Sequence, residues 1–232
     1  MKAVILAAGK GERLGSITEK IPKPMIEIAG MPVLEHNILM CSNSGIEEIF
    51  INLHHLPRMI KDYIGDGEHL GVKIKYSFEP ELLGTAGAID NFQEDLAGMP
   101  FFVIYGDNYF GSDCDLLRFK KFHEEKRSDF TVALSHADDV SQSGVVELSN
   151  DGRITRFVEK PTEVENNHGW VNAGLYMVEP LILKETRGGY ADFAYDVIPS
   201  LIYNKDKVYG YRLKTNVLPI DTPKLLKKQL LI

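Results

Sequence analysis

The sequence lacks long hydrophobic runs. The longest apolar stretch near its start, at 3–8, covers six residues and is followed at once by the charged sequence GKGER. A membrane-spanning helix needs about 20 apolar residues, and a signal peptide needs an apolar core with a cleavage site behind it. We therefore expect a cytoplasmic protein with no membrane partner.

Cysteine is scarce, and positive charge is in the minority. The two cysteines are Cys41 and Cys114, and Cys41 falls in a segment of helical spacing, so we expect reduced thiols and no disulfide. CxxC and HExxH motifs are absent, which excludes the zinc sites built on those spacings. Because 26 Lys and Arg face 33 Asp and Glu, for a net charge of −7, the average surface repels a phosphate backbone. We expect no nucleic-acid partner, although a local basic pocket for a small anion is compatible with this balance.

Apolar, β-branched runs alternate with segments of helical spacing through the first half of the chain. The runs predict strands at 2–7, 48–53, 72–78 and 101–105, and the segments between them predict helices at 33–43, 57–64 and 85–92. This alternation favours an α/β fold with a parallel sheet covered on both faces. A ligand site is then expected at the carboxyl ends of the strands.

The second half has a more antiparallel pattern. A helix is expected around 116–126, and strands at 130–135, 144–160 with a turn at Asp151-Gly152, 169–178 and 208–213. A helix near 193–203 and a short helix from Thr222 complete the prediction. With 232 residues and 44% hydrophobic composition, we expect these strands to extend the same mixed, mainly parallel sheet of one domain, 1–232.

The first expected strand runs into a glycine-rich, basic loop, AAGKGERLG. Gly9 and Gly11 permit a tight turn that presents amide donors to an anion, and Arg13 adds charge. A PKP motif at 22–24 places another cation nearby. The spacing is neither the dinucleotide-binding fingerprint nor a Walker A loop. We interpret the loop as an anion site, with a solvated basic connection as the alternative.

This loop, together with IPKPMIEIAGMPVLEH at 21–36, resembles the start of the sugar-1-phosphate nucleotidyltransferases, which make nucleotide sugars from a nucleoside triphosphate and a sugar 1-phosphate. The resemblance continues through ELLGTAGAI (81–89), YGDN (105–108), SGVVELSNDGRITRFVEKP (143–161) and VNAGLYMV (171–178). It implies a Rossmann-like three-layer α/β/α fold of the nucleotide-diphospho-sugar transferase type. Within it, a nucleotide-binding half would span about 1–112 and a sugar-phosphate-binding half about 113–232.

The resemblance implies three catalytic residues. Arg13 would stabilise the departing pyrophosphate, Lys23 would contact the α-phosphate, and Asp107 would bind Mg²⁺, the expected cofactor. The position of Asp107 behind an apolar strand suits a metal ligand, with capping of the following turn as the alternative. The implied nucleotide-binding residues are Leu6, Ala7, Ala8, Gly9, Gly11, Arg13, Lys23, Gly84, Thr85 and Gly87. For Thr85 the alternative is an N-cap of the following helix.

The FVEKP sequence is implied to bind the sugar phosphate, with Glu159 at sugar hydroxyls and Lys160 at the phosphate. Gly144 and Asn172 would also line this pocket. Adjacent side chains of a regular strand point to opposite faces, so we expect one to reach the ligand and the other to support it, unless Pro161 bends the chain. An exposed ion pair is the alternative.

The C-terminal segment departs from the family pattern. Relatives carry a second metal-binding Asp before a Gly-Thr pair, and in NVLPIDTPKLL that position is Pro219. The nearby carboxylate, Asp221, lies two residues along. We expect it either to reach the same metal or to cap the terminal helix.

The sequence therefore predicts a nucleotidyltransferase, leaning to mannose-1-phosphate guanylyltransferase because LGTAGAI and the 143–161 stretch look most like that group. YGDN looks more like glucose-1-phosphate thymidylyltransferases, and uridylyl, cytidylyl, heptose and N-acetylmuramic acid 1-phosphate relatives remain alternatives. Pro219 motivates a rival of another class, a catalytically weak regulatory subunit that binds nucleotide sugars. His54 and His55 are expected in a loop or subunit contact, and apolar segments such as HHLPRMI suit a homo-oligomer.

Overall fold

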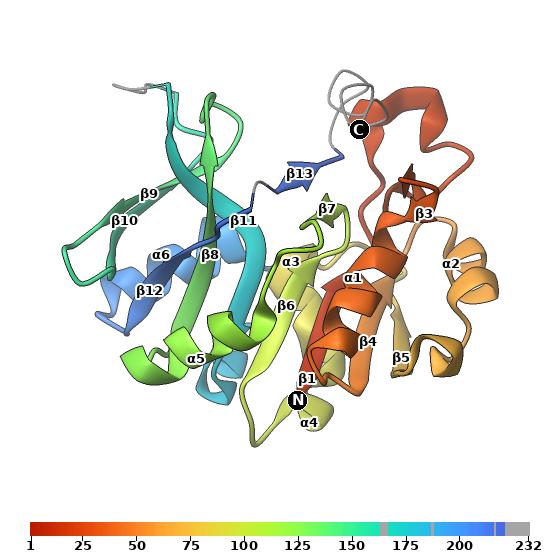
Figure 1. Ribbon diagram of the computed structural model, residues 1–232, viewed down its shortest axis with the longest axis horizontal. Coiled ribbons are helices and arrows are strands. Elements are labelled where there is room, and N and C mark those ends of the chain that lie inside the picture. Colours follow the sequence, from red (N-terminus) through yellow and green to blue (C-terminus); the bar gives the residue numbers. More distant parts are fainter. Residues whose placement is uncertain (163–166, 187, 216, 221–232) are drawn as a thin grey trace.

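The computed structural model describes residues 1–162, 167–186, 188–215 and 217–220. Within these residues, nine strands form one mixed sheet (Figure 1). The strands are β1 (Lys2–Leu6), β4 (Glu48–Leu53), β5 (Lys73–Phe78), β6 (Phe101–Tyr105), β8 (Phe130–Ala137), β9 (Gly144–Leu148), β10 (Ile154–Glu159), β11 (Gly169–Val178) and β12 (Val208–Arg212). The sheet contains strands from both halves of the chain.

The first half of the sheet is parallel, in the order β5-β4-β1-β6. The centres of β1, β4 and β6 are fully buried, which is why these strands read as continuous apolar runs in the sequence. Their carboxyl ends all lie at one edge of the sheet (Figure 1). This is the edge at which the strand pattern predicts a ligand site.

The second half joins through β11, which runs antiparallel to β6 and pairs with β8 on its other side. β12 runs parallel to β8, and the β9–β10 hairpin attaches where Val171 of β11 pairs with Val145. Gly152 in the hairpin turn has a φ of 87°, a conformation that favours glycine. The prediction that the second half extends the same sheet is confirmed.

Helices cover both faces of the sheet. One face, carrying Ala3 and Ile5, packs against α1 (Val33–Asn43), α2 (Pro57–Ile64) and α5 (Leu116–Lys126). The opposite face, carrying Val4, packs against α3 (Gly84–Gly87), α4 (Gln93–Leu96) and α6 (Ile198–Tyr203). Alternate side chains of β1 thus enter two separate cores, and the chain has the predicted Rossmann-like three-layer α/β/α fold.

Two predicted helices differ in detail. The segment 85–92 contains α3 and a 3₁₀ turn, Ala88–Phe92, that leads into α4, and the segment 193–203 begins as a π-helical turn, Phe193–Val197, before α6. The predicted helix from Thr222 lies outside the described residues.

The two cysteines, Cys41 and Cys114, are buried and form no disulfide. Every helix in the described part of the chain is too short or too polar to cross a membrane.

Two short ladders lie outside the main sheet. β2 (Glu27–Ile28) pairs with β3 (Met31–Pro32), and β7 (Asn108–Tyr109) pairs with β13 (Leu218–Pro219). The second ladder lies beside the carboxyl ends of the parallel strands (Figure 1). It brings the C-terminal segment next to the YGDN motif.

Candidate functional site

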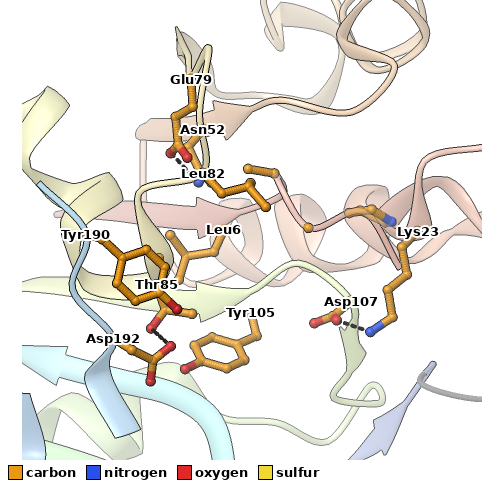
Figure 2. A pocket seen from close by; sticks show the side chains of 14 residues that line it. Leu6, Lys23, Asn52, Glu79, Leu82, Thr85, Tyr105, Asp107, Tyr190 and Asp192 are labelled. Atoms are coloured by element: carbon orange, nitrogen blue, oxygen red, sulfur yellow. Dashed lines mark hydrogen bonds and ion pairs between the residues drawn. The ribbon is translucent and has the colours of Figure 1, made fainter. Parts of the chain in front are cut away.

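Three adjoining cavities open at the carboxyl edge of the parallel strands in the part of the chain that the structure describes. The inner cavity, of about 280 Å³, extends from Leu6 and Glu79 to Lys23 (Figure 2). The outer cavity, of about 510 Å³, contains Glu159 and Lys160. The loop cavity, of about 380 Å³, is formed by residues 9–13 with Lys23, Leu82 and Asp107.

These cavities share walls. The inner and outer cavities have four lining residues in common, which are Thr85, Tyr105, Asp107 and Asp192. Asp107 also lines the loop cavity, and Arg13 lines both the loop cavity and the outer cavity. The three spaces therefore form one continuous site, with the Asp107 carboxylate where all three meet.

An ion pair between Lys23 and Asp107 occupies this junction (Figure 2). Asp107 follows β6, and Lys23 begins a 3₁₀ turn directly after Pro22. Lys23 is only 7% exposed, and an uncompensated ammonium that deep would be costly, so the carboxylate stabilises it. A pre-placed cation at a cavity junction suits an anionic ligand.

The glycine-rich loop is held in shape by its own backbone and by Thr18. Gly11 has a φ of 67°, and a Cβ there would lie 2.8 Å from Thr18 and 3.1 Å from Lys23. The Thr18 hydroxyl donates to the Gly11 carbonyl oxygen at 3.0 Å, and His55 Nε2 donates to the Thr18 carbonyl oxygen at 2.6 Å. Glycine at position 11 thus lets Lys23 pass close to the loop.

The two histidines after β4 hydrogen-bond to backbone carbonyl oxygens of other segments. His55 holds Thr18, and His54 Nδ1 donates to the Glu79 carbonyl oxygen at 2.8 Å. Neither histidine lines one of the three cavities. Their expected place in a loop is confirmed, and in this loop they fasten two segments that form the site.

A buried carboxylate, Glu79, lies at the end of the inner cavity remote from Asp107. It is 1% exposed and accepts hydrogen bonds from Asn52 Nδ2 at 2.8 Å and from the Leu83 amide at 3.1 Å. Asn52 Oδ1 in turn accepts from the Ala7 amide at 2.8 Å. Sequence reasoning missed both side chains, although a polar residue at the end of an apolar strand run is the signal that finds them.

The glycines of LGTAG fit against another segment of the chain. A Cβ on Gly84 would lie 2.3 Å from the Ala191 carbonyl oxygen, and one on Gly87 would lie 2.2 Å from that of Gly189. Contact with residues 189–191 therefore shapes the motif.

The alternative role predicted for Thr85, as an N-cap, is wrong, because the cap position is Leu83 and has no side-chain hydrogen bond.

The Thr85 hydroxyl instead links the two halves of the chain. It donates to Asp192 Oδ2 and accepts from the Phe193 amide, both at 2.9 Å (Figure 2). Because Thr85 and Asp192 each line both the inner and outer cavities, this hydrogen bond lies in the wall between them.

All four residues expected in the sugar-phosphate pocket line the outer cavity, namely Gly144, Glu159, Lys160 and Asn172. The expectation that Glu159 and Lys160 point to opposite faces applies to a regular strand, and the strand does not continue through Lys160. β10 ends at Glu159, and Lys160 has a φ of 45°, so the alternation of a regular strand stops between them. Gly144 makes room for the carboxylate, because a Cβ there would lie 2.6 Å from Glu159 Oε2.

Burial raises the pKa of the Glu159 carboxyl above its usual value, while the neighbouring Lys160 lowers it and Asp192 raises it further. The net direction is upward. Glu159 therefore takes up a proton at a higher pH than an exposed glutamate does.

A chain of hydroxyl groups lies under the outer cavity. Asn172 Nδ2 donates to the Tyr176 hydroxyl at 2.7 Å, which donates to the Tyr105 hydroxyl at 3.2 Å. Burial raises the pKa of both tyrosines, so they stay neutral donors. Asn172 Oδ1 also accepts from the Gly174 amide at 3.0 Å, which fixes the orientation of the side chain.

The residue expected at the second metal position, Pro219, lies directly beside Asp107. Pro219 pairs with Asn108 between β13 and β7, lines the outer cavity, and is followed by Ile220, whose amide donates to the Asp107 carbonyl oxygen at 3.1 Å. Asp221 lies outside the described residues. Among those described, no group of three or more His, Cys, Asp or Glu side chains is placed to hold a metal.

Most of the predicted site residues are brought together. Those lining the inner or loop cavity are Leu6, Ala8, Gly9, Gly11, Arg13, Lys23, Gly84, Thr85 and Asp107. Ala7 and Gly87 lie behind this surface, where the Ala7 amide bonds Asn52 and the Gly87 amide bonds the Ala191 carbonyl oxygen. Sequence reasoning missed the cavity residues Asn52, Glu79, Leu82, Tyr105, Tyr190, Asp192 and Tyr195.

Comparison with known proteins supplies an independent finding. A family model described as "Nucleotidyl transferase" matches residues 2–217. The chain is 37% identical over 219 residues to a UTP–glucose-1-phosphate uridylyltransferase of Synechocystis sp., covering 87% of this chain and 55% of that protein. It is 33% identical over 211 residues to a mannose-1-phosphate guanylyltransferase of Mycobacterium tuberculosis, covering 90% of this chain and 58% of that protein.

Among solved structures, the fold matches the crystal structure of HddC from Yersinia pseudotuberculosis complexed with GMP-PN. The TM-score is 0.82 at 28% sequence identity, and the match covers 99% of this chain and 97% of that chain. By contrast, the chain spans little more than half the length of the two curated relatives.

Proposed function

The chain belongs to the nucleotidyl transferase family, and we propose that it condenses a nucleoside triphosphate with a sugar 1-phosphate to give a nucleotide sugar and pyrophosphate. The observation that carries this proposal is the junction at Asp107, where the inner, outer and loop cavities meet. A reaction between two phosphorylated substrates needs two pockets that open onto one reacting point.

The cations around the junction suit two polyanions. We place the triphosphate along the amides of residues 9–13, with Lys23 at the α-phosphate and Arg13 at the departing pyrophosphate. The sugar phosphate would lie in the outer cavity with Lys160 at its phosphate. Because phosphoryl and nucleotidyl transfer depend chiefly on positioning and charge, no side-chain nucleophile is needed.

The proposed step is an in-line displacement. A sugar phosphate has a second pKa of about 6, so near neutral pH its oxygen is already an anion. That oxygen forms a bond to the α-phosphorus, the bond to the oxygen bridging to the β-phosphate breaks, and pyrophosphate leaves with the electron pair. Lys23 and Arg13 hold the phosphoryl oxygens in place during this displacement.

The donor chemistry at Asp107 fits a Mg²⁺ ion shared with the substrates. Mg²⁺ is usually held by one or two carboxylates together with substrate phosphates and waters, and Asp107 supplies one such carboxylate beside the proposed phosphate positions. When bound, Mg²⁺ would neutralise phosphate charge and polarise the phosphoryl oxygens. Pro219 adds no carboxylate, so Asp107 is the residue of the described chain that we propose as the ligand.

Glu79 supports a preference for guanine. A carboxylate can accept about four hydrogen bonds, and Asn52 and Leu83 account for two. Guanine offers two adjacent donors, N1–H and N2–H, to the remaining positions. Uracil and thymine offer one N–H flanked by two carbonyl oxygens, which a carboxylate repels. GTP with mannose 1-phosphate is therefore the proposed substrate pair, in line with the name of one curated relative.

Pro219 beside Asp107 favours a second candidate, a catalytically weak subunit that binds nucleotide sugars. One experiment separates the two: pyrophosphate release measured with GTP, UTP, dTTP, CTP and ATP against mannose, glucose, heptose and N-acetylmuramic acid 1-phosphates, with and without Mg²⁺. We expect Mg²⁺-dependent turnover, with kcat/KM for GTP at least about tenfold above UTP and dTTP. Absence of turnover with every pair, alongside measurable nucleotide binding, would support the regulatory subunit.

The raised pKa of Glu159 gives a pH-dependent prediction. If the carboxylate accepts sugar hydroxyls, protonating it weakens sugar-phosphate binding. The quantity to follow is kcat/KM for the sugar phosphate, measured for the wild type and divided by the same constant for Glu159→Gln. We expect this ratio to fall as the pH falls, and the pH at which half of the change has occurred to lie above the usual glutamate pKa of about 4.3. The titration of the substrate itself cancels in this ratio.

The matched control for Glu159 is Glu147→Gln, which alters an exposed glutamate paired with Arg156 on the β9–β10 hairpin. Its ratio to wild type should stay constant across the same pH range. A constant ratio for Glu159→Gln as well would remove this carboxylate from sugar binding.

A further inference from the structure

Two tyrosines of one short segment are exposed at the openings of two different cavities. Tyr190 is 72% exposed and lines the inner cavity, and Tyr195 is 57% exposed and lines the outer cavity. Asp192 between them lines both. Aromatic rings in pocket walls supply large contact areas to ligands, and these two expose most of theirs to solvent.

We propose that residues 190–195 give each substrate an aromatic wall, with Tyr190 stacking on the base of the triphosphate and Tyr195 packing on the sugar ring. The inference rests on the proposed function and adds two binding residues to it. The position of the two rings, one in each cavity on either side of the Thr85–Asp192 hydrogen bond, carries it.

The backbone directly after Tyr190 is held by hydrogen bonds. The Ala191 amide donates to the Leu83 carbonyl oxygen at 3.0 Å, and the Ala191 carbonyl oxygen accepts from the amides of Ala86 and Gly87 at 2.9 and 3.0 Å. The absence of a Cβ on Gly84 and Gly87 permits this close approach. Tyr190 therefore projects from a backbone that is anchored at the next residue, which lowers the conformational entropy lost when its ring binds a ligand.

The backbone beneath Tyr195 is fixed as well. Asp192 Oδ1 accepts from the amides of Ala194 and Tyr195 at 2.8 and 3.2 Å and so caps the turn that leads into α6. Phe193, fully buried, packs against Phe130 and Tyr176. The buried phenylalanine anchors the segment, and the tyrosines on either side of it stay outside the core.

The inner cavity has a second apolar wall for a flat ligand. Leu82 is 38% exposed and lines it from the side of Glu79 and Asn52, whereas Tyr190 enters from the side of Thr85 (Figure 2). Every base has a π face, so stacking on Tyr190 adds affinity for any base. Hydrogen bonds to the Glu79 carboxylate would then select among the bases.

The outer cavity is otherwise rich in polar side chains, including Glu159, Lys160 and Asn172. These groups match the hydroxyls and phosphate of a sugar phosphate, and the apolar residues of this cavity, such as Val171 and Val217, carry smaller side chains than a tyrosine. The Tyr195 ring is the large aromatic surface that lines this cavity while remaining mostly exposed. An amphipathic ring of this kind covers C–H groups and keeps its hydroxyl in water.

The test compares Tyr190→Ala and Tyr195→Ala in the full chain, with Tyr203→Ala as the matched control because Tyr203 is 86% exposed and lines none of the three cavities. For Tyr190→Ala we expect the KM for GTP to rise about tenfold while the KM for mannose 1-phosphate stays within about twofold. For Tyr195→Ala we expect the reverse. Phenylalanine at either position keeps the ring, so both KM values of these variants should stay near those of the wild type.

The proposal is overturned if each alanine variant raises the KM for GTP and the KM for mannose 1-phosphate equally, or if neither variant raises either KM. It is also overturned if a phenylalanine variant raises the KM as much as the alanine variant does. Calorimetric titration of GTP and of mannose 1-phosphate with each variant gives the same comparison without turnover. If the wild type releases no pyrophosphate with any substrate pair, the proposed function fails. The titrations then decide the role of the two tyrosines on their own.

Discussion

Replacing Asp107 with asparagine is expected to lower turnover by at least about a hundredfold while the protein remains folded. The carboxylate lies where the three cavities meet, holds the Lys23 ammonium, and is the proposed Mg²⁺ ligand. An asparagine amide has nearly the same shape but carries no charge. The Lys23 ammonium and the proposed metal site would both lose the carboxylate at the point where the substrates react.

The measurement is pyrophosphate release across a range of Mg²⁺ concentrations, together with the thermal unfolding temperature. A control exists in Asp95→Asn, since Asp95 pairs with Lys75 at 2.5 Å and lines none of the three cavities. That variant removes an ion pair without touching the site, so its turnover should match wild type. Near wild-type turnover in Asp107→Asn would remove Asp107 from the reaction.

The sheet and the meeting of the charged residues could be predicted because their signals are local. Arg13 and Asp107 each follow an apolar run that reads as a strand, and the parallel strands β1 and β6 bring their carboxyl ends to one edge. Lys160 follows β10, which is antiparallel to β9, so its place in the same site came from the resemblance to the family and not from the strand pattern. The resemblance to the family added the roles of these residues. Strand order and the antiparallel entry of β11 beside β6 explain why both halves of the chain reach the same cavities.

The contacts that shape the rest of the site could not be predicted because they join distant segments of the chain. Thr85 bonds Asp192 across 107 residues, which no local spacing indicates. The glycines at 84 and 87 have the same explanation, since the atoms they make room for belong to residues 189–191. Tyr190 and Tyr195 enter the cavities only because this long-range contact places their segment there.

The change of direction at Lys160 has a different cause. A strand pattern predicts alternation for as long as the backbone stays extended, and Lys160 adopts a φ of 45° directly before Pro161. A left-handed conformation at a lysine is strained, and such strain is common where a side chain is held for binding. Pro161 in the sequence indicates that the strand can end here, but it does not indicate the resulting direction of the Lys160 side chain.

Replacing Arg13 with methionine should lower kcat by about a hundredfold or more without lowering the unfolding temperature. Arg13 is exposed on a 3₁₀ turn, Glu12–Ile17, and lines both the loop cavity and the outer cavity. Its neighbour Leu14 is buried against Ile26, Ile28, Val33 and Ile220, which holds the turn in place whatever side chain stands at position 13. The loss would therefore fall on charge stabilisation of the departing pyrophosphate and not on the fold.

Two further variants make this test specific. Arg13→Lys keeps the positive charge but loses the planar, bidentate donors, so its kcat should lie between wild type and Arg13→Met. Arg58→Met removes an exposed arginine from α2 that lines none of the three cavities, and its kcat should be unchanged. If Arg13→Met and Arg58→Met behave alike, the guanidinium at position 13 plays no part in the transfer, and the phosphate-binding role of the glycine-rich loop would rest on its backbone amides alone.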